Sequence, residues 1–193
     1  MAQKRIASFR LLRPLLATAA SAAVALSLSA VAMAEPTNLA LGRPYEVTAW
    51  EPNPEHEKIA ATYPDTNNVE LTDGKVDDSA NLYNDAWVGF LRQGGRTVTI
   101  DLGREANLSK VLIRFLHAQG AGIGLPNMVQ VSFSLDGTKY GPAMDLTPQE
   151  DVEKDATVIP FAADLQGVKA RYVQVSWDNP IWVFVDEIQV LGE

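Results

Sequence analysis

The sequence predicts an all-β protein, an antiparallel β-sandwich or barrel, on three observations. Apolar and polar residues alternate through most of the chain from Thr97 onward, which is the period of half-buried strands. No segment after residue 34 keeps a period near 3.6, so the crossover helices of a parallel α/β fold are missing. Turn-forming pairs interrupt the alternating runs at Leu102-Gly103, Asp136-Gly137, Gln166-Gly167 and Asn179-Pro180.

The strand candidates follow one another along the chain. In TVTIDL (97–102) and MVQVSFSL (128–135), apolar residues take alternate positions and so share one face. VLIRFLH (111–117) and RYVQVSW (171–177) are further candidates. In an all-β domain, binding is expected in the long loops that such strands position. The longest irregular stretches are 51–69, 90–96, 118–127 and 141–155.

The first 34 residues have the pattern of a secretory signal peptide. Basic residues precede an uncharged run rich in Ala, Leu, Ser and Val, which ends in Ala32-Met33-Ala34. This pattern predicts cleavage after Ala34, which leaves residues 35–193 as a single domain that is secreted, periplasmic or at the cell surface. The alternative is an uncleaved membrane anchor, but the run is Ala-rich and weakly apolar for a lasting span. We expect no membrane insertion of the mature chain.

Charge restricts the partners of this domain. The chain has 16 Lys and Arg against 24 Asp and Glu; four of the basic residues precede the apolar run, so 12 remain and residues 35–193 carry a net charge near −12. Nucleic acid and anionic lipid would repel such a protein, so we expect an uncharged or cationic partner. The chain has no cysteine, which excludes disulfides and thiolate metal sites.

The order of short motifs along the chain resembles the discoidin family, also called coagulation factor type C domains, whose bacterial members include many carbohydrate-binding modules. The resemblance covers about Asn38 to Glu193 and implies a jellyroll-like, galactose-binding-like β-sandwich with ligand loops at one end. Typical members bind glycans, some animal members bind lipid headgroups or collagen, and they are not catalysts. The motifs are NLALGRPY, LTDG, AWVGF, TVTIDLG, KVLIRFL, VQVSFSLDGTKY, ARYVQVSW and VDEIQVLGE.

The resemblance also implies a structural calcium ion between the turn at the "DG" pair and a glutamate near the C-terminus. In this sequence the pair is Asp73-Gly74 and the glutamate is Glu187. Calcium takes six to eight oxygen ligands, so we expect Asp78 or Asp77 as a third carboxylate, with turn carbonyls completing the set. The alternative is a solvated Asp-rich turn with Glu187 in an ordinary salt bridge.

Sugar recognition needs an aromatic face for the C–H side of a ring and planar polar groups for its hydroxyls. Alternatives stay open for the loop residues that could supply these groups: Tyr63 and Trp182 could pack inward, His56 could be merely solvated, His117 ends a strand, and Arg92 could form a loop ion pair. The predicted ligand-binding residues are His56, Tyr63, Arg92, His117, Asn179 and Trp182.

The other tryptophans are expected in the core. Trp50 and Trp87 stand beside strand-like residues, and Trp177 ends an alternating strand on the face of its apolar residues. Large aromatic side chains dominate the cores of sandwiches, so core positions are favoured over sugar platforms for these three residues.

These observations predict a secreted, non-catalytic carbohydrate-binding module for neutral glycans, with a suspected structural calcium. One alternative is an adhesin-type protein- or lipid-binding domain that uses Gly89–Leu91 as an apolar spike. Another is a small glycan-active enzyme with a carboxylate pair such as Asp77/Asp78 or Asp186/Glu187. Adjacent residues on a strand point to opposite faces, which disfavours the second pair.

Overall fold

A computed structural model describes residues 35–66 and 68–193. The predicted signal peptide, residues 1–34, lies outside the described residues, so its cleavage and the export of the protein stay predictions. The described strands, in chain order, are β1 (Thr37–Asn38), β2 (Tyr45–Ala49), β3 (Val88–Leu91), β4 (Gly95–His117), β5 (Val129–Ser134), β6 (Met144–Asp145), β7 (Thr147–Pro148), β8 (Thr157–Asp178) and β9 (Trp182–Gly192).

The strands form a two-layered antiparallel sandwich, as the alternation predicts. The long strands β4 and β8 bend and contribute to both layers, with the register of their pairing broken between Asp101 and Ala106. The first half of β4 pairs with β2 and with the second half of β8, which also pairs with β5. The second half of β4 pairs with β9 and with the first half of β8. Every strand pairing in the described part is antiparallel.

The core lies between the layers. Val98 and Ile100 of the first half of β4 and Ile113 and Phe115 of its second half have no exposed surface. The rings of Phe115 and Trp177 meet edge to face with their centroids 5.9 Å apart, and so join the two layers. Trp87 and Trp177 therefore take the predicted core positions. The prediction for Trp50 is wrong, because 42% of its surface is exposed.

One helix stands in the stretch predicted to be irregular. Helix α1 (Pro54–Ala60) begins after Asn53, whose side chain accepts hydrogen bonds from the backbone amides of Glu55 and His56. Pro54 at the first helical position and acidic residues in the first turn favour this start. The short 3-10 helices are η1 (Glu70–Thr72) and η2 (Gln119–Ala121). None of the described helices is long and apolar enough to span a membrane.

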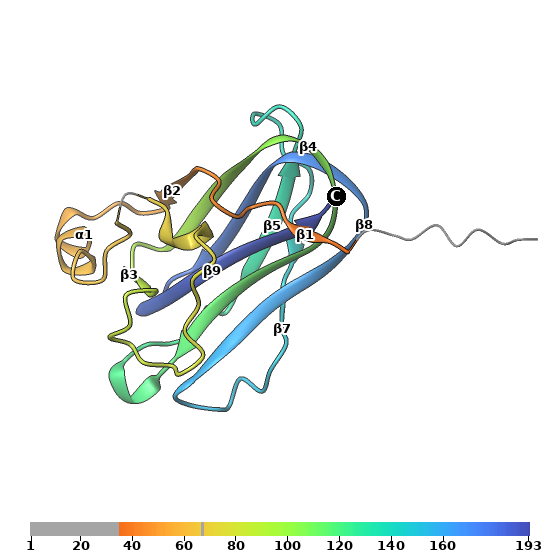
Figure 1. Cartoon of the computed structure of the whole chain (residues 1–193). Helices are drawn as coiled ribbons and strands as arrows, with labels where there is room; N and C mark the ends of the chain where they lie inside the picture. Colours follow the sequence, from red (N-terminus) through yellow and green to blue (C-terminus); the bar gives the residue numbers. More distant parts are fainter. Residues whose placement is uncertain (1–34, 67) are drawn as a thin grey trace, which may run out of the picture. The chain divides into compact units, whose positions relative to one another are not determined.

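Loops gather at one end of the sandwich. In Figure 1, α1, β3 and η2 lie at the left end, and the C-terminus lies at the right. Residues of the loops at the left end supply the site described next.

Candidate functional site

Three loop segments enclose an open depression of about 510 Å³. Residues 51–56 form one wall with the start of α1, residues 92–94 form the second, and residues 178–180 form the third. The depression brings together His56, Arg92 and Asn179, which are three of the six ligand-binding residues predicted from sequence.

Side chains hold the three walls in place. The Oε1 atom of Gln93 accepts a hydrogen bond of 3.0 Å from the backbone amide of Asn53. The carbonyl oxygen of Arg92 accepts bonds from Asn179 Nδ2 at 2.9 Å and from Arg96 Nη1 at 2.8 Å. Gln93, Arg96 and Asn179 are all buried, so these bonds are partly shielded from water.

Three residues that line the depression carry buried polar atoms without partners in the described part of the chain. His56 Nδ1, Gln93 Nε2 and Asn179 Oδ1 are buried and have no hydrogen-bond partner among the described residues. A buried polar atom without a partner costs about 1 to 3 kcal/mol, so such atoms point to a ligand or a bound water. Asn179 must turn its oxygen away from Arg92, because the carbonyl there can only accept.

The wall at residues 92–94 is strained. Arg92, Gln93 and Gly94 have φ values of 49°, 71° and 73°, in the left-handed region that disfavours side chains. Each non-glycine residue there costs about 1 to 2 kcal/mol. Backbone strain of this kind is typical of functional sites, where the surrounding structure holds it. Arg92 and Gln93 both line the depression.

Tyr63 and Trp182 lie in a second hollow. Their rings meet edge to face at 5.7 Å, and both pack on Phe184. They line a groove of about 360 Å³ together with Tyr83, which is 78% exposed and which the sequence did not single out. None of these aromatic residues lines the depression, so the predicted set divides between two surfaces.

His117 joins neither surface. Only 3% of its surface is exposed, and its Nδ1 lies 2.7 Å from the carbonyl oxygen of Lys154. Its Nε2 lies 3.0 Å from Gln119 Nε2. With both ring nitrogens engaged, His117 ties the end of β4 to neighbouring loops, and its placement does not support the predicted ligand role.

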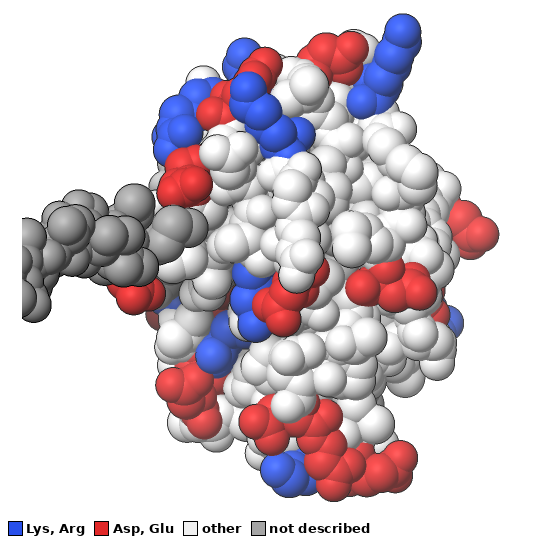
Figure 2. Space-filling view, turned by 90° about the vertical axis from the view of Figure 1, so that its right-hand side faces the viewer, with Lys and Arg blue, Asp and Glu red and all other residues white. Residues whose placement is uncertain are grey.

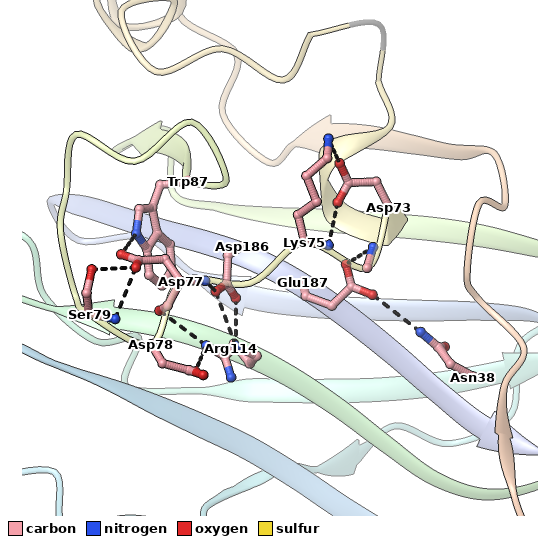
Figure 3. Close-up of polar contacts among 11 residues, drawn as sticks. Asn38, Asp73, Lys75, Asp77, Asp78, Ser79, Trp87, Arg114, Asp186 and Glu187 are labelled. Carbon is pink, nitrogen blue, oxygen red and sulfur yellow. Dashed lines mark hydrogen bonds and ion pairs between the residues drawn. The ribbon is translucent and has the colours of Figure 1, made fainter.

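The turn at Asp73-Gly74 docks on β9 through Glu187. Glu187 has no exposed surface; its Oε2 accepts a bond of 3.1 Å from the Gly74 amide, and its Oε1 accepts one of 3.3 Å from Asn38 Nδ2 (Figure 3). Burial, with a contribution from the charges of Asp73 and Asp186, raises the pKa of Glu187 to about 7. No basic side chain pairs with Glu187 within 35–66 and 68–193. A carboxylate buried without a basic partner is one of the oxygen ligands that a hard cation takes.

Asp78 belongs to a neighbouring ion-pair group around Arg114. Its carboxylate lies 2.8 Å from Arg114 Nη2, and Arg114 Nε lies 3.0 Å from Asp186 (Figure 3). Asp77 accepts bonds from the Trp87 indole and from Ser79. The described residues contain no group of three or more His, Cys, Asp or Glu side chains placed to hold a metal ion. The Asp73 carboxylate pairs with Lys75 Nζ at 2.7 Å, and Glu187 meets the turn through the Gly74 amide. Asp78 joins neither residue, because it pairs with Arg114.

Comparison with known proteins finds likeness in structure alone: no family model and no curated protein match the chain. The lectin domain of lectinolysin complexed with Lewis B antigen matches with a TM-score of 0.57 at 16% identity, over 82% of this chain and 99% of that one. A Streptococcus pneumoniae fucose binding module gives 0.54 at 13%, over 82% and 96%. An f-lectin from Morone saxatilis (striped bass) serum gives 0.52 at 16%, over 81% and 49%.

The chain shares the β-sandwich fold of these three structures. At these identities the likeness extends to the β-sandwich and its topology, and membership of the discoidin family stays a prediction. The lectin-like fold places the loops of the depression on a rigid sandwich.

Charge is unevenly spread on the side of the molecule away from α1. Figure 2 shows acidic side chains gathered at the lower edge of that side, acidic and basic ones together near the upper edge, and a mostly uncharged surface with a few charged groups between them. No continuous basic surface of the kind that a phosphate backbone needs is seen in that view.

Proposed function

We propose that this protein is a non-catalytic carbohydrate-binding module whose depression binds a neutral glycan. The observation that carries the proposal is that His56, Gln93 and Asn179 line one depression, and that each has a buried polar atom without a partner among the described residues. Gln93 offers a donor and Asn179 an acceptor. A sugar hydroxyl both donates and accepts, whereas a phosphate oxygen only accepts and an ammonium group only donates.

The similar structures support a sugar as the ligand. The lectinolysin domain is complexed with Lewis B antigen, and the pneumococcal module is a fucose binding module. The sequence adds a net charge near −12 for residues 35–193, which favours a ligand without negative charge.

The rival functions find little support among the described residues. Gly89–Leu91 lies in β3 and is buried, with Phe90 packed on Trp177, so the predicted apolar spike is not formed. Asp186 and Glu187 have no exposed surface and cannot reach a substrate together. Asp77 is buried and bonded, so Asp77 and Asp78 do not form a free carboxylate pair.

The proposal includes a structural calcium ion and export from the cell. Asp73 and Glu187 would hold the ion, with carbonyl oxygens of the turn between them, and its charge would balance a carboxylate that is buried without a basic partner among the described residues. Export rests on the leader-like sequence of residues 1–34.

An array of neutral, sialylated and sulfated glycans tests the proposal. We expect binding to neutral glycans, lost in Arg92→Ala and kept in Arg104→Ala, an exposed arginine that lies outside the depression. Binding that survives Arg92→Ala in full, or that occurs only with charged glycans, would place recognition elsewhere.

A further inference from the structure

The layer that contains β2 and β5 carries an uncharged polar surface on its outer face. Thr97 and Thr99 of β4 lie opposite Ser176 and Gln174 of β8, and these two lie opposite residues 130 and 132 of β5. Directly paired residues project from the same face, so all six side chains share the outer face. We call this surface the polar plate, defined as Thr97, Thr99, Gln130, Ser132, Gln174 and Ser176.

Trp50 stands at one end of the polar plate. Its indole Nε1 donates a bond of 3.0 Å to Thr97 Oγ1, and its backbone amide donates one of 3.1 Å to the Gly95 carbonyl. A Cβ added at Gly95 would lie 2.5 Å from the indole ring. Glycine at this position therefore leaves room for the ring to lie against the strand, while 42% of the Trp50 surface stays exposed.

The same residue adjoins the depression. Glu51, the next residue, lines the depression, and its amide donates to the carbonyl oxygen of Gln93. Asp178 also lines the depression, and it is the strand partner of Gly95, the residue against which the indole lies. Trp50 therefore lies between the depression and the polar plate.

A third hollow, of about 450 Å³, lies at the far end of the plate. Thr99, Asp101, Tyr140 and Tyr172 contribute to its lining. The Tyr140 hydroxyl is buried and has no partner among the described residues. From Gly95 to this hollow the β4 strand advances six residues, roughly 20 Å at about 3.3 Å per residue. That length suits a chain of several sugar residues.

We propose that an extended neutral oligosaccharide lies across Trp50 and along the polar plate, with one end in the depression. The inference rests on the proposed function and adds a chain of linked sugars to it. An exposed indole stacks on the C–H face of a sugar, and the hydroxyl and amide groups of the plate meet its hydroxyls. The six plate residues are uncharged, and the residues that border them, Glu46 opposite Thr99 and Asp145 opposite Gln130, are acidic, which favours a neutral chain over an anionic one. It also has no apolar side chain, which disfavours a protein partner with an apolar core.

Calorimetric titration with matched sugars tests the inference. The probes are glucose, galactose, mannose and N-acetylglucosamine, each with its linear oligomers up to the hexasaccharide. We expect at least one hexasaccharide to bind about tenfold more tightly than its monosaccharide, and Trp50→Ala to remove that gain while leaving monosaccharide affinity unchanged. Trp50→Phe, which keeps a ring, should retain part of the gain. Tyr83→Ala, in the separate aromatic groove, is the matched control and should change neither affinity.

The outcomes separate the two proposals. Equal affinity for monosaccharide and hexasaccharide, or a chain-length gain that survives Trp50→Ala, overturns the extended site and leaves the depression as the binding site. Absence of binding to every probe overturns both proposals. Near-ultraviolet circular dichroism from the buried Trp87 and Trp177 checks that the Trp50 variants are folded.

Discussion

The side-chain amide of Asn179 donates a hydrogen bond of 2.9 Å to the carbonyl oxygen of Arg92, and this bond joins two walls of the depression. The two residues are 87 positions apart in sequence. The bond fixes which end of the amide faces the ligand, since only the nitrogen can donate to Arg92. Asn179 thus supports the strained turn at residues 92–94 and also presents an acceptor to the depression.

Asn179→Ala should weaken glycan binding at least tenfold and lower the free energy of unfolding by about 1 kcal/mol. The stability loss stays moderate because the Arg92 carbonyl keeps its bond from Arg96. Urea unfolding and titration with a glycan identified on the array measure the two effects. Undiminished affinity in a folded Asn179→Ala protein would contradict a contact between Asn179 and the ligand.

Gly94→Ala should reduce both stability and glycan affinity. Gly94 has φ of 73°, and an added Cβ would lie 3.1 Å from the Glu51 side chain in the depression. Gly122→Ala is the matched control, because Gly122 has φ of 75° with nothing within 4 Å of the added Cβ. Both substitutions should cost about 1 to 2 kcal/mol of stability through backbone strain. Equal affinities of the two variants would show that the Gly94 turn does not shape the binding site.

Calcium should raise the melting temperature of the wild-type protein by about 5 to 10 °C at an ion concentration about a hundredfold above its Kd. Glu187→Gln should abolish this rise, because a neutral amide cannot balance the ion's charge. Differential scanning calorimetry with calcium and with chelator measures the shift. Asp78→Asn is the control: Asp78 pairs with Arg114, so its loss should leave the calcium shift intact. A full calcium shift in Glu187→Gln would contradict the proposed ligand set.

The strands were predictable because alternation is a local property of the sequence. The positions of Arg92 and Asn179 in loops followed from it, whereas His56 lies in α1 within a stretch predicted to be irregular. Gln93 was missed, since its role depends on a left-handed backbone and on a bond from Asn53. The double glycine after it in LRQGG was the available signal for an unusual turn.

Other differences arise where local pattern is ambiguous. A residue at the end of a strand can point inward or outward, and His117 points inward while Trp50 stays at the surface. Trp50 is exposed because a neighbouring strand supplies Gly95, and such a pairing cannot be seen in a single alternating run. Likewise, Asp78 is drawn to Arg114, which lies 36 positions away.

Asp65 should make stability depend on pH between 4.5 and 6. Burial raises the pKa of Asp65 to about 6 from 3.8, with a contribution from the neighbouring Glu70. Between these values the folded protein holds a proton at Asp65 that the unfolded chain has released. The free energy of unfolding therefore falls as pH rises through this range. The range begins at pH 4.5 because the pKa of Glu70 lies below 4.5, the ordinary value for a glutamate, so Glu70 titrates outside the range.

Asp65→Asn removes the titrating carboxyl group, so the free energy of unfolding should depend less on pH between 4.5 and 6. Because Asp65 is only half-buried, solvent screening reduces its contribution to about 1 kcal/mol. Urea unfolding of both proteins at several pH values measures the difference, and titration at other groups cancels between them. The wild-type curve should fall more steeply than the variant's from pH 4.5 to 6, and the two should run parallel above pH 7. Parallel curves across the whole range would mean that Asp65 keeps an ordinary pKa, because the hydrogen bond of 2.6 Å that Tyr45 donates to it, which lowers the pKa, offsets the effect of burial.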